Sequence, residues 1–441
     1  MDPTPTLTLA MYVMIPNKSI AKLLSATMTA ALIKGSGLLV SFVFLAVVAR
    51  QMSPENYGFF ASMYSVAIFS GMALNFGQEQ IILRFNQFGA EKKASSRMAS
   101  LLISSFAFVI VGAGIIWLFL LAGTVTWTAS GKQLDFVAVS VTFAVGISLA
   151  FAHSMAAAFR MRGEIVTGIG PRDVVWRLLA VVLILGFGLT EPVGTMLTLL
   201  AILSLLVLMQ LIGLFQGAEF SKLEFPVGKL LHERMSRSFW FWGNTVLAED
   251  LVLAAIVIFI GWTFGPVEAG AYFACSRISR LLSISVMATN QLLGPMVSGA
   301  FKNGEVGKCR QLLIWANVMS GVIAFVGAGS LVVLGPQLLK LFDQAYTDYT
   351  HILYILVVGQ LVHGCLGASQ IVLLMSDNEV PVLIIKLAGT IVSLVANYCL
   401  YVFFGLAGIA AGSSIFFIII FGGLTLLASN RLNQPVAEHT K

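Results

Sequence analysis

The chain has 441 residues, of which 58% are apolar and only 10% are charged, and its formal net charge is +6. A soluble globular domain carries about 25% charged and roughly 45–50% apolar residues. The composition therefore predicts a membrane protein and excludes a soluble enzyme built from domains with polar linkers.

Long apolar runs follow one another along the chain, separated by polar and Pro/Gly clusters. A transmembrane helix needs about 20 apolar residues to cross a hydrocarbon core of roughly 30 Å. We therefore predict an all-α polytopic membrane protein with about twelve transmembrane helices. Their predicted ranges are 28–50, 57–82, 98–122, 134–158, 172–189, 193–215, 239–262, 268–296, 311–334, 348–375, 381–403 and 406–429.

The distribution of Lys and Arg predicts the orientation, because loops rich in positive charge stay in the cytoplasm. With the N-terminus inside, nineteen Lys and Arg residues fall on inside segments, and only Arg50, Lys132 and Lys340 fall outside. Both termini are therefore predicted to be cytoplasmic. The same distribution accounts for the positive charge without a nucleic-acid partner.

A short motif occurs twice. Ser53–Ser65 aligns with Gly265–Arg277 at an offset of 212, which pairs Pro54 with Pro266 and Gly58 with Gly270. Each copy joins one predicted helix to the next, so we predict two copies of a six-helix unit around a central site. The alternative is a chance match. The predicted division is a cytoplasmic segment (1–27), a first bundle (28–215), a cytoplasmic linker (216–238), a second bundle (239–429) and a cytoplasmic tail (430–441).

Several ionisable residues fall inside the predicted helices, where each costs about 2.5–3.5 kcal/mol unless it faces a wet cavity or a partner. The bases are Lys34, Arg277, Arg280 and Lys386, and the acids are Glu249 and Asp250. Two acids cannot pair four bases, so we predict a positively charged cavity that binds an anion. In the alternative reading, the two acids only neutralise the arginines.

Polar residues at helical spacing extend this predicted lining. One stripe holds Lys386, Thr390, Ser393 and Asn397, a second holds Gln360, His363 and Gln370, and Gln291 lies near the face of Arg277. The alternative is that such residues join helices by hydrogen bonds, and that His153 and His363 are simply packed.

Motifs for other chemistries are missing from the sequence. The nearest approach to G-x-x-x-x-G-K-[ST] is "GEVGKC" at Gly304–Cys309, so the chain encodes no ATP-binding P-loop. Cys275, Cys309, Cys365 and Cys399 lie too far apart in sequence for a metal or redox motif. We expect no metal and no cofactor apart from a coupling H⁺ or Na⁺.

The segment "ARQMSPENYGFFASMYSVAIF" and the "NFGQEQIILRF" that follows it resemble the Wzx-type polysaccharide and O-antigen flippases. This family lies within the multidrug/oligosaccharidyl-lipid/polysaccharide (MOP) exporter superfamily. The resemblance implies a V-shaped pair of six-helix bundles in the bacterial inner membrane. It also implies a substrate, the undecaprenyl-pyrophosphate-linked oligosaccharide repeat unit for O-antigen, exopolysaccharide or capsule, moved by ion-coupled alternating access.

On this interpretation Lys34, Arg277, Arg280 and Lys386 attract the pyrophosphate or acidic sugars. Glu249, Asp250 and Glu79 are the candidates for binding the coupling ion. The expected partners are the lipid-linked oligosaccharide, membrane lipid, a polysaccharide polymerase and a chain-length regulator. One rival is a multidrug exporter of organic cations, whose pocket should be acidic and aromatic. Another is a membrane-embedded glycan polymerase or ligase, which should carry a large external loop.

Overall fold

The computed structural model describes residues 17–79, 82, 102–115, 136–215, 239–240, 242–244, 247, 249–376 and 378–433. Every regular element in these ranges is a helix. Seven of the described helices are long and apolar enough to cross a membrane, and one of these, Glu379–Leu432, contains two helices joined at a kink. The prediction of an all-α polytopic membrane protein is confirmed.

Helices lie in each of the twelve predicted ranges. The first half contains α2 (Asn17–Gln51), α3 (Pro54–Asn75), a helix over Leu102–Ile115, α6 (Phe136–Met161), α7 (Ile165–Gly170), the π-helix η1 (Pro171–Val175), α8 (Trp176–Phe187) and α9 (Pro192–Phe215). The second half contains α11 (Glu249–Thr263), α12 (Pro266–Ser279), the 3₁₀-helix η3 (Arg280–Leu282), α13 (Ser283–Lys302), α14 (Val306–Phe342), η4 (Gln344–Tyr349), α15 (Thr350–Leu366), α16 (Ala368–Met375) and α17 (Glu379–Asn433).

The helix boundaries differ from the predicted ones at both ends of the chain. Helix α2 begins at Asn17, inside the predicted segment 1–27, because a helix can continue beyond the apolar run that crosses the bilayer. The last two predicted helices are joined through Gly405, whose φ of 57° lets the chain turn without a loop. The predicted linker 216–238 lies outside the described residues.

The turn between α2 and α3 shows why the chain reverses where it does. Ser53 is the N-cap of α3, and its hydroxyl accepts a hydrogen bond from the backbone N–H of Asn56 at 3.2 Å. Pro54 follows at the first helical position, where its missing N–H costs nothing. This turn, together with the turn at Phe264 and Gly265 between α11 and α12, marks what we call the far end of the molecule.

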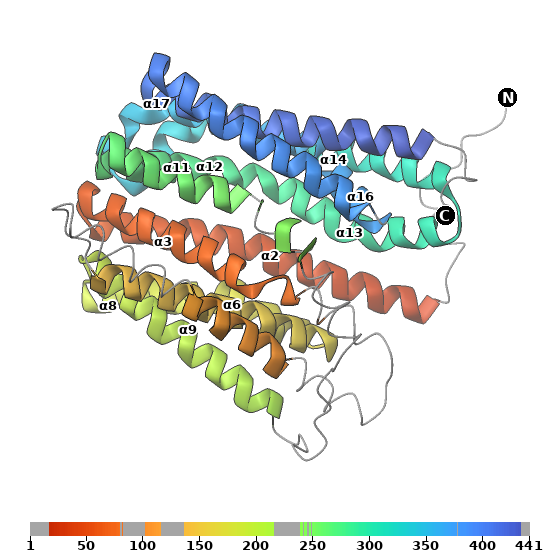
Figure 1. Ribbon diagram of the computed structural model, residues 1–441, viewed down its shortest axis with the longest axis horizontal. Helices are drawn as coiled ribbons and strands as arrows, with labels where there is room; N and C mark the ends of the chain where they lie inside the picture. Colours follow the sequence, from red (N-terminus) through yellow and green to blue (C-terminus); the bar gives the residue numbers. More distant parts are fainter. Residues whose placement is uncertain are drawn as a thin grey trace.

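The near end is where α2 begins and α17 ends, on the right in Figure 1. Helix α3 packs against both α11 and α12, whereas α9 and α17 splay apart toward the near end (Figure 1). Helix α2 contacts elements of both halves, α7 and α8 in the first and α13 and α14 in the second.

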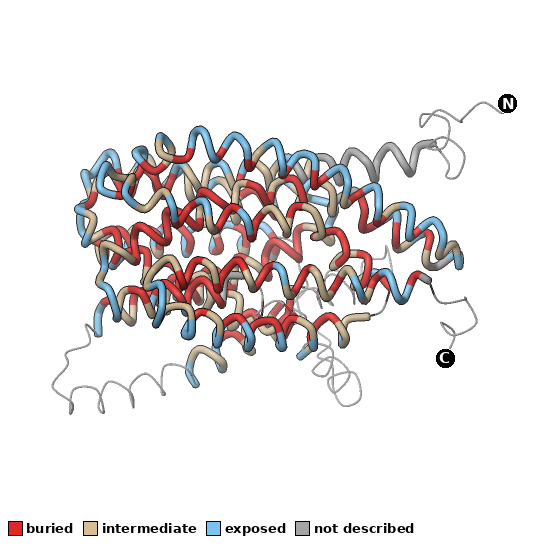
Figure 2. Tube along the Cα trace, turned by 90° about the horizontal axis from the view of Figure 1, so that it is seen from above, coloured by how far each residue is buried: buried red, intermediate tan, exposed pale blue. Residues whose placement is uncertain are grey.

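The outer surface carries many large apolar side chains, among them Trp262, Phe325 and Phe403. Figure 2 shows exposed residues along the outer faces of the helices and buried residues between them. One hydrophobic core cluster extends over helices of both halves, for example from Phe44 to Phe273 and Leu353. An apolar exterior over a packed interior is the arrangement expected of a protein surrounded by lipid.

Candidate functional site

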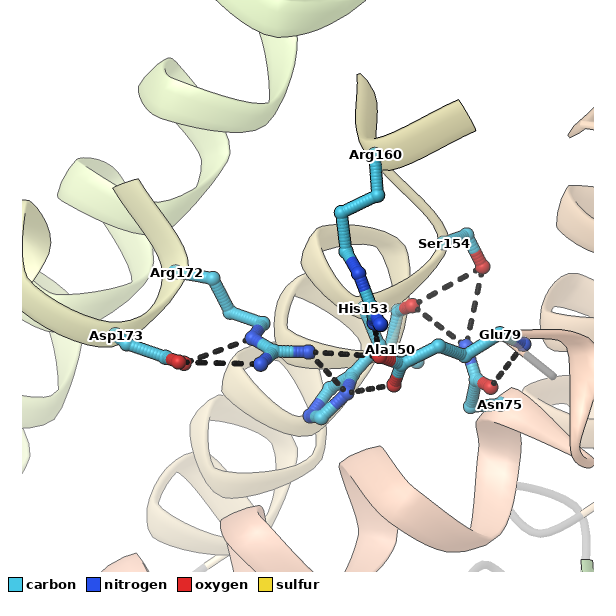
Figure 3. Close-up of polar contacts among 8 residues, drawn as sticks. All are labelled: Asn75, Glu79, Ala150, His153, Ser154, Arg160, Arg172 and Asp173. Carbon is cyan, nitrogen blue, oxygen red and sulfur yellow. Dashed lines mark hydrogen bonds and ion pairs between the residues drawn. The ribbon is translucent and has the colours of Figure 1, made fainter. Parts of the chain in front are cut away.

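A cluster of charged side chains lies in the first half, and we call it the N-half network. Its members are Glu79, His153, Arg160, Arg172 and Asp173. Oε1 of Glu79 accepts hydrogen bonds from Nη1 of Arg160 at 3.3 Å and from Nη1 of Arg172 at 3.1 Å. Oε2 lies 2.9 Å from Nδ1 of His153. Figure 3 shows these side chains converging on the Glu79 carboxylate.

The guanidinium of Arg172 connects the two carboxylates of the network. Its Nε and Nη2 donate to Oδ1 and Oδ2 of Asp173 at 2.8 and 3.1 Å, opposite the contact with Glu79 (Figure 3). The Arg172 side chain is only 11% exposed. A bidentate pair shielded from water is stronger than an exposed one. Both residues lie in the π-helix η1, which begins at Pro171, and π-turns are frequent at functional sites.

Helix α2 brings Lys34 to this network. A Cβ on Gly37 would lie 3.0 Å from the backbone oxygen of Asp173, so glycine at this position allows α2 to pack directly on η1. Lys34 lies about one turn before Gly37, on the same face of α2. The sequence-predicted residue Lys34 therefore lies on the face of α2 that packs on η1, beside the network that contains Glu79.

A break in the helix sets the position of Glu79. The chain leaves α3 through two residues with positive φ, Phe76 at 46° and Gly77 at 69°. The side chain of Asn75 donates to the hydroxyl of Ser154 at 3.1 Å and accepts from the backbone N–H of Glu79 at 3.1 Å. A left-handed residue other than Gly is unfavourable by about 1–2 kcal/mol and persists only where its surroundings hold it. The break directs Glu79 toward α6.

His153 has two alternative partners in the network. Its Nδ1 lies 2.9 Å from Oε2 of Glu79 and 3.3 Å from Nη1 of Arg172. A proton on Nδ1 makes it a donor to Glu79, whereas a bare Nδ1 accepts from Arg172. One proton position on His153 therefore decides which of the two ionic partners it binds.

The second half contains a cavity of about 250 Å³, which we call the C-half cavity. Its polar lining residues are Arg280, Asn290, His363, Gln370 and Lys386. Aromatic side chains, Phe416 and Phe421, complete one wall, and the imidazole of His363 stacks on Phe421 with ring centroids 4.3 Å apart. Among the lining residues that the structure describes, two are basic and none is acidic.

Two of the predicted bases meet in this cavity. Lys386 is 5% exposed, and its Nζ donates to the backbone oxygen of Asn244 at 2.9 Å. Arg280 opens the 3₁₀-helix that interrupts the α12–α13 segment. It also lines a smaller adjoining cavity together with Gln360 and Ser276. Arg280 thus lies between two internal spaces.

Arg277 occupies a different place from Arg280, one turn earlier. Its guanidinium lies 4.6 Å from the ring centroid of Phe273, in a cation–π contact, and it does not line the C-half cavity. The ring of Phe273 in turn contacts Tyr57 and Tyr64 of α3. Arg277 therefore lies beside the contact between the two halves.

The polar stripe on α17 divides into two parts. Lys386 lines the C-half cavity, but Thr390, Ser393 and Asn397 do not. Ser393 donates to the backbone oxygen of Gly412 at 3.2 Å, and Asn397 donates to the backbone oxygen of Ser393 at 2.8 Å. Ser393 therefore joins the two sections of α17, as the packing alternative describes, whereas Asn397 forms its hydrogen bonds within the first section.

The remaining predicted residues lie partly outside the described structure. The backbone of Glu249 and Asp250 opens α11 and that of Gln291 lies in α13, but their side chains are outside the described residues. Among the described residues, no group of three His, Cys, Asp or Glu side chains could hold a metal ion.

Nothing in the sequence pattern alone marks Arg160, Arg172, Asp173 or Asn290 as site residues. The two arginines lie beside apolar runs and are among the nineteen inside charges that predict the orientation. The "GPRDVVW" segment carried a signal, since an Arg–Asp pair leading directly into an apolar helix needs a partner once it is buried. The partner is Glu79, which is too far from Arg172 in the sequence for the pairing to be predicted.

The fold is that of an all-α polytopic membrane protein, and comparison with solved structures agrees. An inward-facing MATE family multidrug resistance transporter of the MOP superfamily matches with a TM-score of 0.68 and 17% identity, covering 93% of this chain and 98% of that chain. The outward-facing conformation of such a transporter matches with a TM-score of 0.65 and 16% identity, covering 92% and 95%.

A MOP superfamily transporter from Pyrococcus furiosus, described as having a binding pocket of reverse polarity, matches with a TM-score of 0.66 and 16% identity, covering 92% of this chain and 95% of that chain. At these identities the likeness establishes the fold alone. The family model for polysaccharide biosynthesis proteins matches residues 23–301. The chain therefore belongs to this polysaccharide biosynthesis family, and the predicted family is confirmed. No curated protein sequence matches the chain at a significant level.

Proposed function

We propose that the protein is a flippase that moves undecaprenyl-pyrophosphate-linked oligosaccharide repeat units across the bacterial inner membrane. The observation that supports this proposal is the C-half cavity, where two bases, Arg280 and Lys386, stand among the described lining residues. A pyrophosphate needs charge-assisted hydrogen bonds in a site shielded from water, and Arg and Lys supply them. An organic cation would be repelled there, which disfavours the multidrug-exporter alternative.

The orientation is part of the same proposal and rests on the distribution of Lys and Arg, which predicts that both termini are cytoplasmic. The near end would then face the cytoplasm and the far end the periplasm. The closed contacts of α3 with α11 and α12 and the splayed near end then describe an inward-facing state that can receive substrate from the cytoplasm. A polymerase and a chain-length regulator would use the product at the far end.

Ion coupling is assigned to the N-half network. Both oxygens of the Glu79 carboxylate are held by Arg160, Arg172 and His153, so a coupling Na⁺ would have to displace a base. A coupling proton displaces no base. When it binds Nδ1 of His153, the imidazole donates to Glu79 and no longer accepts from Arg172. We therefore propose H⁺ as the coupling ion, with occupancy of this site shifting the balance of inward and outward states.

The test uses a strain that lacks the gene and carries either the native protein or the Arg280→Gln variant. We expect the variant to accumulate lipid-linked oligosaccharide on the cytoplasmic side and to lose surface glycan. Lys340→Gln, which alters an exposed lysine near the far end of α14, is the control and should export normally. Normal surface glycan together with altered resistance to cationic drugs in the Arg280→Gln strain would favour the multidrug exporter instead.

A further inference from the structure

At the far end of the molecule, a layer of aromatic side chains fills the contact between the two halves. It consists of Phe44, Tyr57, Phe60, Tyr64, Phe273, Phe342 and Tyr346, contributed by α2, α3, α12, α14 and η4. On α3 the spacing of Tyr57, Phe60 and Tyr64 places all three on one face. The rings of Phe60 and Tyr64 stack with centroids 5.5 Å apart and planes inclined by 20°.

The hydroxyls of Tyr57 and Tyr64 in this layer are buried without a hydrogen-bond partner in the described part of the chain. Tyr57 is 0% exposed and Tyr64 is 1% exposed, and neither phenol oxygen has a hydrogen-bond partner among the described residues. Tyr346, in the same layer, donates to the backbone oxygen of Pro54 at 3.3 Å. A buried Tyr hydroxyl normally has a partner, and an unpartnered one lowers the stability of the state in which it occurs. Phenylalanine would close this layer better than tyrosine.

The position of the layer suggests why tyrosine is present. Tyr57 and Tyr64 both contact Phe273 across the interface between α3 and α12. If this interface opens during transport, the two phenols are among the first groups to be uncovered. The guanidinium of Arg277 contacts the same Phe273 ring, so the opening would uncover it as well.

We propose that Tyr57 and Tyr64 form a glycan-binding surface of the exit path, which is assembled for use only when the halves separate at the far end. This inference rests on the proposed flippase function. Aromatic faces pack against the C–H faces of sugar rings, and the phenol hydroxyls bond to sugar hydroxyls, which is the combination found in small-molecule sites. The hydroxyls lack partners in the closed state because the sugar is their partner in the open state.

The experiment measures stability and export on the same variant, Tyr57→Phe/Tyr64→Phe. Removing two unpartnered hydroxyls should raise the melting temperature of the purified protein by about 1–3 °C. The rate of surface-glycan export should fall roughly fivefold, since the open path loses two hydrogen bonds to sugar. Tyr354→Phe is the matched control, because its hydroxyl is bonded to the backbone oxygen of Val332 at 3.0 Å. It should lower the melting temperature slightly and leave export unchanged.

Each other outcome overturns the inference. Export at the native rate from the double variant would make the layer a simple seal. A lower melting temperature would mean that the hydroxyls are bonded in the resting state. A strain lacking the gene is assayed in parallel. If that strain exports glycan normally, the proposed function fails and this inference with it. If it exports none and the double variant restores export fully, only the inference fails.

Discussion

Gly270 of α12 lies directly against Gly58 of α3, since a Cβ added to Gly270 would stand 3.2 Å from both Cα and N of Gly58. These two residues are also equivalent in the sequence repeat, at an offset of 212. Equivalent helices related by a pseudo-two-fold axis meet at equivalent residues close to that axis. Glycine at both positions allows the two backbones to touch.

The first prediction concerns this contact. A Cβ on Gly58 would lie 1.7 Å from the backbone oxygen of Pro266, so Gly58→Ala must push α3 and α12 apart. We expect the closed state to lose about 1–3 kcal/mol of stability, as in other overpacked interfaces. A lower melting temperature and reduced glycan export measure the effect.

Gly35→Ala is the control for that variant. No heavy atom lies within 4 Å of a Cβ at Gly35, and replacement of Gly in a helix usually stabilises it. Equal effects of the two substitutions would contradict a special role for the contact.

The second prediction concerns the N-half network. Arg172→Gln removes the cation that pairs with both Glu79 and Asp173, and leaves two partly buried carboxylates. We expect a loss of about 3–5 kcal/mol in the free energy of unfolding, measured by thermal or denaturant unfolding. Arg172→Lys should restore only part of it, because an ammonium cannot form the bidentate contact.

An exposed ion pair provides the comparison for Arg172. Nζ of Lys308 lies 3.0 Å from Oε2 of Glu305, and the Lys308 side chain is 50% exposed. Lys308→Ala should change stability by about 1 kcal/mol or less. A similarly small change for Arg172→Gln would refute the network's structural importance.

The third prediction separates packing from substrate binding on α17. Asn397→Ala removes hydrogen bonds to the backbone oxygen and the hydroxyl of Ser393 at 2.8 and 3.2 Å. We expect a loss of about 0.5–1.5 kcal/mol in stability with normal export per folded molecule. Lys386→Gln, by contrast, should reduce export per folded molecule. If the Asn397→Ala protein is stably folded but does not export glycan, Asn397 takes part in substrate binding and is not only a packing residue.

The fourth prediction concerns the broken helix before Glu79. The indole of Trp242 donates to the backbone oxygen of Ala73 at 2.8 Å, and its ring lies 5.4 Å from that of Phe76. Trp242→Phe should keep the ring contact and lose the hydrogen bond, at a cost of about 0.5–1.5 kcal/mol in unfolding free energy. Trp315→Phe, on the exposed face of α14, should have little effect. Unfolding curves of both variants measure the difference, and an equal effect of the two substitutions would contradict the prediction.

The fold was predictable in outline because lipid imposes a simple rule, one apolar run for each helix. The same rule does not predict where helices are interrupted. The π-turn at Pro171, the 3₁₀-turn at Arg280 and the bend at Gly405 lie within or beside apolar stretches. Hydropathy does not distinguish them from continuous helix, because it reports how apolar the residues are and not how the backbone bends.

The candidate site was predictable only in part, for a related reason. Periodicity placed Lys386 and Gln370 on inward faces, and the structure brings both to the C-half cavity with Arg280. It could not tell that Asn397 packs against Gly412, since a polar residue that joins helices and one that lines a cavity have the same spacing.

The sequence by itself determined that this is an all-α membrane protein and that a glycine motif occurs twice in the chain. It also predicted about twelve membrane-spanning helices and an excess of bases inside them. Only the tertiary structure decided how that charge is divided between the N-half network and the C-half cavity. It also decided that the recurring glycines meet each other. Composition and periodicity follow from each helix's separate contact with lipid, whereas pairing depends on contacts between helices far apart in the chain, such as Glu79 with Arg172.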